Sequence, residues 1–456
     1  MDQQTTKRSS FTGKIGFVLA AAGSAVGLGN IWRFPYLAAK YGGGIFLLVY
    51  VALAVSFGFA LMLAEIAIGR KTGKSAIGAF STLDKRFSFM GWVTALVPII
   101  ILPYYSVIGG WVMKYIFGFV TGDGANMVND DYFGNYIGQV GEPILWFALF
   151  LIITAVVVFF GVEKGIEKVS KIMMPILIAF MLFIVIYTFC TLDGALEGAL
   201  YYIKPDFSKF SVMTVVAALG QLFYSMSIAM GIMITFGSYM KKDISIEKSV
   251  HQVEIFDTGI AFLSGLMIVP AVFAFSNGNE DALGKGPSLM FVTLPKIFET
   301  MPGGSIIGAL FFIMVFFAAV TSSISLMETV VSIVMDKAKL SRKVSCIVVF
   351  GGAFLLGLPS TLGYSIWSDV LIFGKFQFLD FFDFISNSVI MPVIAIIMCI
   401  FVGYIIKPKT IIEEAQLEGK PFTVKLFSVI IKYVAPICIL AILVSSILDA
   451  VGILKI

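Results

Sequence analysis

The chain has 456 residues, of which 59% are hydrophobic and 13% are charged, and its formal net charge is +4. So few charges exclude an ordinary soluble globular protein, and repeated apolar runs near twenty residues are typical of transmembrane helices. The four cysteines, Cys190, Cys346, Cys399 and Cys438, lie in apolar segments without a CxxC spacing and are expected to be unreactive thiols.

The apolar runs predict an all-α membrane protein with eleven spans. In chain order the spans are expected near residues 14–38, 42–69, 89–120, 143–162, 169–190, 212–239, 252–276, 304–335, 344–357, 376–405 and 427–452. The first run continues to a spanning length and further spans follow it, so a cleavable signal peptide is not expected.

Lys and Arg residues are concentrated in alternate connecting segments. Twenty-two of them lie in segments on one predicted side, including those around Arg70, Lys164 and Lys241, whereas seven lie in the opposite segments. Because cytoplasmic loops are enriched in Lys and Arg, this alternation supports the span count, a cytoplasmic N-terminus and an external C-terminus. Membrane topology thus explains the positive net charge, which gives no indication of nucleic-acid binding.

The first and sixth predicted spans contain unusual interruptions. Residues 21–36 read AAGSAVGLGNIWRFPY, with Asn30 and Arg33 in an apolar run, and residues 220–239 include Ser225 and Gly231. Since these spans are five apart, the second half would begin on the opposite side of the membrane, as in an inverted repeat. The chain is predicted to divide into a cytoplasmic tail (1–13), spans 1–5 (14–190), an external loop (191–211), spans 6–10 (212–405), a cytoplasmic loop (406–426), and span 11 with the C-terminus (427–456).

Interrupted spans at matching positions indicate a binding site near the middle of the membrane. Unwound backbone leaves unpaired N–H and C=O groups, which are costly in hydrocarbon, so it persists only where it lines a cavity. Freed carbonyls suit a hard cation, and a helix N-terminus suits an anion. The alternative for the segment GSAVGLG is a close-packing face of small residues. The second interruption, together with Asn30 and Arg33, favours the binding site.

The segment AAGSAVGLGNIWRFPYLAAKYGGGIFL resembles the first-span signature of the neurotransmitter:sodium symporter family, which includes bacterial LeuT-like amino-acid transporters. The motifs AEIAIGR, PYY, GQLFYSMS, FFAAVTSSISLMETV and LDFFDF match in the same order, so the resemblance covers residues 8–405. It implies the LeuT fold, a 5+5 inverted repeat with discontinuous first and sixth helices, followed here by an eleventh helix. It also implies a location in the cytoplasmic membrane of a bacterium.

The resemblance further implies a substrate site in which the backbone of Leu28 and Gly29 meets a carboxylate. The full implied set is Ser24, Ala25, Leu28, Gly29, Ile101, Tyr105, Tyr224, Ser225, Ser227, Met230, Ser322 and Leu326. Monoamine transporters of the family carry an aspartate where this chain has Gly27, so amino acids are the favoured substrates. Met230 and Leu326 would form an apolar, adaptable pocket, which favours a hydrophobic amino acid.

Two sodium sites are implied by the same resemblance. The first would use the Ala25 carbonyl, Asn30, Ser225 and Asp257, and the second would use the Gly23, Val26 and Ala318 carbonyls, Thr321 and Ser322. Asp257 stands where the family usually has asparagine, and Ala261 stands where it has a chloride ligand or an acid. We therefore expect no chloride requirement, because a second anion about 5 Å away would be repelled by a few kcal/mol.

Alternatives exist for two of these assignments. Asp257 could be a solvated residue near the cytoplasmic end of its span, and the hydroxyls of the TSS segment could bond their own helix backbone. A further hypothesis is that Asp257 takes a proton when sodium leaves, which would give proton antiport.

Charged pairs on both sides of the site are implied as gates. Arg33 and Asp383 would close the external side with Tyr224 as a lid over the substrate, and Arg8 would pair with Asp336 on the cytoplasmic side. Buried ion pairs have a net stabilisation near zero, which suits contacts that break in each cycle. The alternative for Arg8 and Asp336 is that they are ordinary charges at helix ends.

The sequence therefore predicts a sodium-coupled symporter, and not an enzyme, that imports a hydrophobic L-amino acid by alternating access. Its partners would be the amino acid and the lipid bilayer, and its assembly a monomer or weak homodimer. The alternatives are an ion channel, which would need a continuous wet pore, and a sodium-coupled transporter of a different small zwitterion. An intramembrane enzyme would need His251, the only histidine, close to a membrane serine. Leucine, methionine, tyrosine and tryptophan are not distinguished as substrates.

Overall fold

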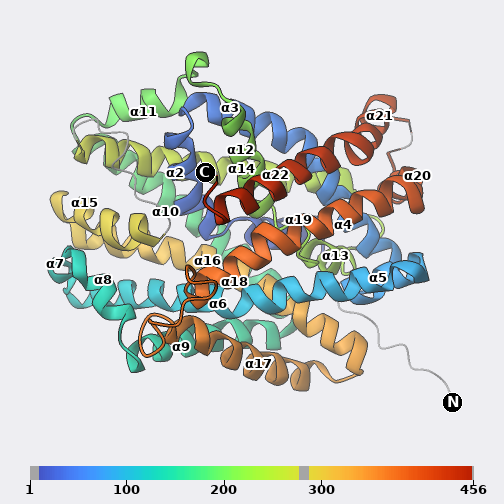
Figure 1. Cartoon of the computed structure of the whole chain (residues 1–456), viewed down its shortest axis with the longest axis horizontal. Helices are drawn as coiled ribbons and strands as arrows, with labels where there is room; N and C mark the ends of the chain where they lie inside the picture. The colour runs from blue at the N-terminus through green and yellow to red at the C-terminus, as the bar shows by residue number, and fades with distance from the viewer. Residues whose placement is uncertain (1–9, 277–286, 418, 454–456) are drawn as a thin grey trace.

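The computed structural model describes residues 10–276, 287–417 and 419–453. These residues form helices, short connections and two isolated β-bridges, and no strand occurs among them. The long helices run roughly along one axis of the molecule (Figure 1). The predicted all-α fold is confirmed.

Helices lie at all eleven expected positions, but among the described residues nine are long and apolar enough to cross a membrane, or ten if the bent first pair is one span; at the sixth position α12 (Val212–Ser225) is a shorter apolar helix. The second span contains α3 (Gly44–Leu53) and α4 (Phe59–Thr72), the third α6 (Ser88–Thr121), the fourth α9 (Gly141–Phe159) and the fifth α10 (Lys168–Thr191). The seventh span contains α14 (Ile246–Phe275), the eighth α16 (Gly304–Ala338) and the ninth α17 (Arg342–Leu362). The tenth contains α18 (Phe378–Asp383) and α19 (Met391–Ile400), and the eleventh contains α21 (Pro421–Val429) and α22 (Ala435–Ala450). The helix α17 is longer than the expected 344–357, because Ser360 and Thr361 end the apolar run without ending the helix. Within several spans a π-helical turn, such as Val162–Glu167, joins or precedes the α-helical parts.

The first and sixth spans are interrupted, as predicted. The first consists of α1 (Lys14–Ala25) and, after a bend of 57°, a π-helical turn (Gly29–Arg33) that leads into α2 (Phe34–Lys40). The sixth consists of α12 (Val212–Ser225) and α13 (Ile232–Gly237), separated by a turn. Both breaks lie in the interior of the molecule, because the residues around them are buried.

Short helices mark the two ends of the molecule in Figure 1. At the right lie α5 (Ala76–Leu83) and α20 (Lys407–Ala415), and we call this the α5–α20 end. At the left lie α7 (Gly124–Met127), α8 (Asp130–Ile137), α11 (Ala195–Ile203) and α15 (Leu294–Thr300), and we call this the α7–α15 end.

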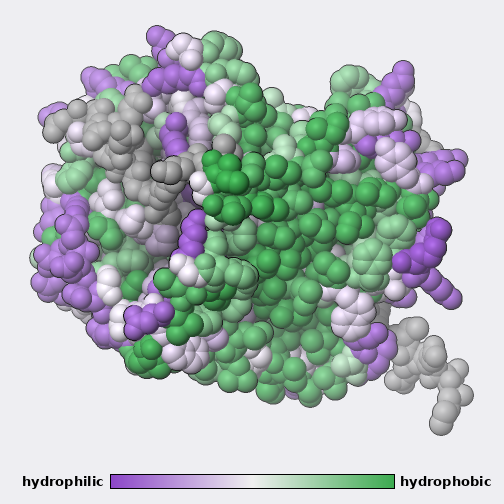
Figure 2. Space-filling model, viewed as in Figure 1, coloured by the Kyte–Doolittle hydropathy of each residue, from purple (hydrophilic) through white to green (hydrophobic). Residues whose placement is uncertain are grey.

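The surface between the two ends is apolar. Figure 2 shows hydrophobic residues over the middle of the visible face and hydrophilic residues gathered towards the ends. On α22, for example, the apolar side chains of Ile437, Leu440 and Val444 are exposed. An apolar belt between two polar ends is the surface that a multi-pass membrane protein presents to lipid.

Close packing of the second and sixth spans depends on a glycine. At Gly69 in α4, a Cβ atom would lie far inside van der Waals contact of the backbone carbonyl of Ile234 in α13. A backbone carbonyl cannot rotate away as a side chain can, so the two helices would have to separate. At Gly351 in α17, by contrast, no atom lies within 4 Å of the Cβ position.

Gly69→Ala should therefore lower the free energy of unfolding by about 1–3 kcal/mol or more, the usual cost of overpacking. Gly351→Ala should be neutral or stabilising by about 0.5–1 kcal/mol, because alanine is the better helix former. Thermal unfolding of the two purified variants measures the difference. Equal midpoints would contradict this account of the α4–α13 contact.

An ion-pair cluster joins α4 to α20 at the α5–α20 end. The buried Arg70 donates from Nε to Glu414 Oε1 (2.7 Å) and from Nη1 to the Ile244 carbonyl (2.6 Å). Lys242 Nζ also donates to Glu414 Oε1, at 2.7 Å. Burial alone would raise the pKa of the Glu414 carboxyl, but the hydrogen bonds from Lys242 and Arg70 outweigh burial and lower this pKa.

This cluster should make stability fall at acid pH. Because the pKa of Glu414 is lower in the folded than in the unfolded protein, its contribution is present above the unfolded pKa and is lost as the pH falls through the folded pKa. Glu414→Gln should destabilise the protein at neutral pH and weaken the decline below about pH 4.3, the ordinary Glu value. Unfolding midpoints across this pH range test the expectation, which fails if both proteins decline equally.

Candidate substrate and sodium sites

Two glycines allow the first span to open beside the sixth and eighth spans. After α1, Val26 takes an extended conformation (φ −74°, ψ 99°), and helical backbone angles resume at Leu28 (φ −56°, ψ −32°), directly before the π-helical turn. A Cβ atom at Gly29 would collide with the ring of Tyr224, and one at Gly27 would lie 3.0 Å from the Ser322 hydroxyl. Glycine at these positions lets α12 and α16 approach the opened backbone closely.

The break in the sixth span is held in an unusual backbone conformation. Ser227 and Ala229 have φ values of 53° and 62°, in the left-handed region that disfavours residues other than glycine. The Ala229 N–H donates a 2.6 Å hydrogen bond to Oε1 of the fully buried Glu65. Glu65 therefore fixes the interrupted backbone and does not line the cavity beside it.

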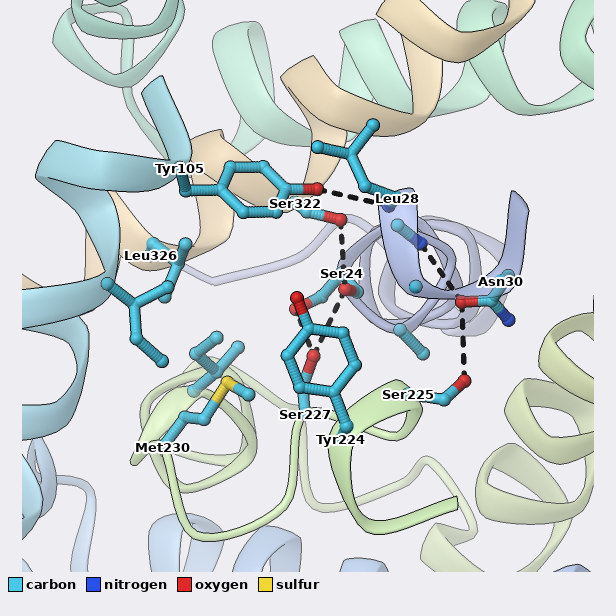
Figure 3. Close-up of a pocket in the computed structure, with 15 residues that line it drawn as sticks. Ser24, Leu28, Asn30, Tyr105, Tyr224, Ser225, Ser227, Met230, Ser322 and Leu326 are labelled. Atoms are coloured by element: carbon cyan, nitrogen blue, oxygen red, sulfur yellow. Dashed lines mark hydrogen bonds between the residues drawn. The ribbon is translucent and has the colours of Figure 1, made fainter. Parts of the chain in front are cut away.

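A cavity of about 40 Å³ lies between the two breaks (Figure 3). All twelve residues predicted for the substrate site line it, namely Ser24, Ala25, Leu28, Gly29, Ile101, Tyr105, Tyr224, Ser225, Ser227, Met230, Ser322 and Leu326, and Gly27, Asn30 and Ile232 complete the lining. This volume holds only a few water molecules at about 10–15 Å³ each. An amino acid would enter only if flexible side chains such as Met230 moved outwards.

Polar and apolar groups occupy different sides of the cavity. The Leu28 N–H donates to the Tyr105 hydroxyl (3.3 Å), and the Ser227 hydroxyl donates to a carbonyl of the first span (3.0 Å). Met230 and Leu326 lie together away from these groups (Figure 3). The arrangement can bind charged groups at one end of a small molecule and an apolar group at the other.

The structure brings Asn30, Ser225 and Asp257 together beside the cavity, with Ala25 in its wall. Asp257 Oδ1 accepts hydrogen bonds from Asn30 Nδ2 and Ser225 Oγ, both at 2.7 Å. Asp257 Oδ2 accepts from the Tyr50 hydroxyl at 3.3 Å. Sequence reasoning missed Tyr50, which lies in an ordinary apolar run of the second span.

Asp257 is fully buried, so the alternative of a solvated residue is wrong. Within residues 10–276, 287–417 and 419–453, no Lys, Arg or His forms a salt bridge with its carboxylate. A buried carboxylate without a cationic partner is costly. Carboxylate, amide and hydroxyl oxygens are the donors that hard cations prefer, so this group of residues fits a sodium ion.

The residues implied for the second sodium site meet where α1 packs against α16. The Ser322 hydroxyl lies within hydrogen-bond distance of the Gly23 and Val26 carbonyls, at 3.3 and 3.1 Å. Thr321 instead bonds its own helix, with its hydroxyl 3.2 Å from the Ala318 carbonyl. The alternative, in which the hydroxyls of the TSS segment bond their own helix backbone, therefore holds for Thr321 but not for Ser322, whose hydroxyl bonds carbonyls of the first span.

Arg33 and Asp383 both line a vestibule of about 490 Å³ next to the cavity. The Arg33 guanidinium lies 5.4 Å from the centroid of the Tyr224 ring. Asp383 Oδ1 accepts hydrogen bonds from the Tyr104 hydroxyl (3.1 Å) and Asn387 Nδ2 (2.7 Å). Although both residues are described, they form no salt bridge within 4.0 Å, so this pair does not close the vestibule in this structure.

Arg8 lies outside the described residues, so its predicted pairing with Asp336 is not described by the structure. Asp336 Oδ2 accepts a 2.9 Å hydrogen bond from the Ser75 N–H. Phe11 is fully buried with its ring 6.3 Å from that of Tyr239, and its N–H donates to the Tyr239 carbonyl at 3.2 Å. The segment before α1 therefore covers this side of the site.

Sequence reasoning also missed a buried charged cluster near Phe11. Glu328 in α16 is fully buried, accepts a 2.7 Å hydrogen bond from the Tyr239 hydroxyl and forms a bidentate ion pair with Arg342. Its only sequence signal was an acidic residue in the apolar eighth span. Gln221, an amide in the sixth span, was missed in the same way and donates to the Gly29 carbonyl at 3.1 Å.

Known proteins resemble this chain along almost its whole length. The sequence model of the sodium:neurotransmitter symporter family matches residues 8–125 and 127–453. The uncharacterized sodium-dependent transporter YhdH of Bacillus subtilis is 34% identical over 458 residues, covering 98% of this chain and 99% of that protein. An uncharacterized sodium-dependent transporter of Haemophilus influenzae is 32% identical over 462 residues, covering 98% and 100%.

A solved structure is similar along nearly the whole chain. The crystal structure of MhsT in complex with L-phenylalanine superposes with a TM-score of 0.87 and 37% sequence identity, covering 96% of this chain and 100% of that one. The arrangement of the helices thus agrees with the expected LeuT fold. The chain belongs to the sodium:neurotransmitter symporter family, whose members are sodium-dependent membrane transporters.

Proposed function

We propose that this protein couples the import of a hydrophobic L-amino acid to sodium bound at two sites, by alternating access and without chloride. The observation that carries the proposal is Asp257, a buried carboxylate that forms no salt bridge with any described Lys, Arg or His and lies beside a cavity with polar and apolar sides. A sodium ion there would compensate the carboxylate and attract the carboxylate of an amino acid. The resident MhsT ligand, L-phenylalanine, supports an apolar substrate.

Coupling follows from charge in a site shielded from water. Sodium and the substrate carboxylate have opposite charges, so each raises the affinity of the other by the same factor, typically worth about 1–3 kcal/mol. The Leu28 N–H and the Tyr105 hydroxyl are the groups proposed to meet the carboxylate. A second ion between the carbonyls of Gly23 and Val26 and the Ser322 hydroxyl would hold the first span against the eighth.

Three features support an amino acid with an apolar side chain. Gly27 places no acid in the cavity, so an amine without its own carboxylate would lack a counter-charge. Met230 and Leu326 supply an apolar wall that can adapt to different shapes. Asp257 supplies a fixed negative charge, and Ala261 is buried and carries no ligand for chloride, which supports transport without chloride.

We also propose that the α5–α20 end faces the cytoplasm, since the Lys-rich and Arg-rich connections gather there. The N-terminus would then be cytoplasmic and the C-terminus external, in a bacterial cytoplasmic membrane. The division into a tail (1–13), two five-span repeats (14–190 and 212–405) and a final span (427–456) belongs to the same proposal, as does a monomer or weak homodimer.

The test is uptake into proteoliposomes that contain the purified protein. A panel of the twenty amino acids should compete with a labelled apolar amino acid when sodium is present outside, and accumulation above the equilibrium level should vanish without a sodium gradient. Replacing chloride by gluconate should leave uptake unchanged. Flux that never exceeds equilibrium would instead indicate a channel, and competition by zwitterions other than amino acids would indicate a different substrate class.

Asn30→Ala should raise the sodium concentration required for half-maximal uptake at least about tenfold, equivalent to about 1.4 kcal/mol. The change removes an oxygen of the proposed first sodium site and the Nδ2 donor that orients Asp257. Asn387→Ala removes an amide from the vestibule and serves as the matched control. The assignment is wrong if Asn30→Ala keeps the wild-type sodium dependence.

A further inference from the structure

An apolar groove lies between α9 and α17, outside the transport site. It has a volume of about 310 Å³ and is formed by Val156, Phe159 and Phe160 from the fourth span and by Cys346, Ile347 and Phe350 from the ninth. The two helices lie side by side along the lower edge of Figure 1. The groove is at the C-terminal end of α9 and the N-terminal end of α17.

The lining of the groove suits hydrocarbon and not water. Water in a cavity needs two to four polar partners, and the lining offers no polar side chain apart from the Cys346 thiol. Phe160 and Ile347 are 62% and 67% exposed, so the groove opens onto the outer surface of the helix bundle. In a membrane that surface faces lipid, and an acyl chain is the apolar group available there.

A positive charge lies at one end of the groove. Lys343 is on the first turn of α17, and its Nζ lies 5.8 Å from the ring centroid of Phe159, which lines the groove. In the part of the chain that the structure describes, the exposed Lys343 forms no salt bridge with an acidic side chain. A lysine near the membrane surface attracts an anionic lipid headgroup with about 1 kcal/mol.

We propose that the groove binds an anionic phospholipid of the cytoplasmic leaflet, with an acyl chain between α9 and α17 and the phosphate at Lys343. The apolar lining selects the chain, and the lysine at its end selects the charge of the headgroup. This site is separate from the amino-acid and sodium sites.

The bound lipid would stabilise the closed arrangement of the nearby cytoplasmic side. Arg342, next to Lys343, donates from Nε to the Val158 carbonyl (2.9 Å), one residue before Phe159. Arg342 also pairs with Glu328, the partner of Tyr239, which contacts the segment before α1. A lipid that keeps α9 and α17 together therefore preserves the contacts that hold this side closed.

The experiment measures thermal unfolding of delipidated protein in detergent, with phosphatidylglycerol or phosphatidylcholine of identical acyl chains added. Phosphatidylglycerol should raise the unfolding midpoint by about 2–5 °C, and phosphatidylcholine by clearly less. Lys343→Gln should reduce the phosphatidylglycerol response to the phosphatidylcholine level. Ala155→Phe, which fills the groove from α9, should remove the response to both lipids.

The control variant is Lys337→Gln, which should keep the full response. Lys337 is also an exposed lysine at the end of a membrane helix, with its Nζ 4.9 Å from the Trp92 ring centroid, and does not line the groove. Native mass spectrometry of lipid adducts gives a second readout if Ala155→Phe lowers stability by itself. Equal responses to the two lipids, or full responses in both groove variants, would overturn the proposal. Neither readout depends on transport, so the lipid proposal can fail while the proposed symport stands.

Discussion

Asp257→Asn should raise the sodium concentration for half-maximal uptake by about 10- to 100-fold, the effect of losing about 1.4–2.8 kcal/mol of ion affinity. The substitution keeps an oxygen that can accept from Asn30 and Ser225, so hydrogen bonding changes little while the charge is lost. One charge at about 4 Å from a cation contributes about 4 kcal/mol at an effective dielectric constant of 20. The expected loss is smaller, because the hydrogen-bonding groups remain.

Added chloride should partly restore uptake by this variant, because an anion could then occupy the space near the lost charge. Glu254→Gln is the matched control: Glu254 is a buried carboxylate one turn away on the same helix, and its replacement should change sodium affinity much less. Sodium-dependent thermal stabilisation of the purified protein provides a readout without transport. If Asp257→Asn binds sodium like the wild type and ignores chloride, the proposed first sodium site is wrong.

Arg342→Gln should lower the free energy of unfolding by about 3–5 kcal/mol, the usual result of removing one partner of a buried ion pair. Glu328 is fully buried, and without Arg342 the hydrogen bond from Tyr239 would be the one polar contact left to its carboxylate among the described residues. The double variant Glu328→Gln with Arg342→Gln should recover most of the loss, because it buries no charge.

The control for this prediction is Lys343→Gln in detergent without lipid. It removes the same charge from the adjacent, exposed position and should change stability by less than about 0.5 kcal/mol. Chemical or thermal unfolding of the four proteins completes the comparison. A double variant that is no more stable than Arg342→Gln alone would show that the pair contributes more than mutual neutralisation.

The spans and the candidate cavity were predictable because their signals are local. Long apolar runs identify each span, and small or polar residues inside two of those runs mark the breaks. The motif in the first span positions Leu28 and Gly29, and the structure places them in one cavity with residues of the sixth and eighth spans. Local pattern and family resemblance thus sufficed for the twelve cavity residues.

The missed residues act through partners far away in the sequence. Tyr50 reaches Asp257 from another span, and Glu328 is paired with Arg342 across the connection of the eighth and ninth spans. A single tyrosine or glutamate in an apolar run does not reveal such a partner. The separation of Arg33 from Asp383 is a different case, since it depends on the conformation of the vestibule and not on residue identity.

The left-handed backbone conformation of Ala229 affects how the affinity of the cavity differs from one substrate to another. Glycine at this position would be free to take several backbone shapes, whereas alanine bound to Glu65 is restricted to far fewer. Adjustment to a larger or smaller guest then falls to the rotamers of Met230 and Leu326, which alter the available space in small increments. Affinity should accordingly vary smoothly with the bulk of the guest, without an abrupt division between aliphatic and aromatic amino acids.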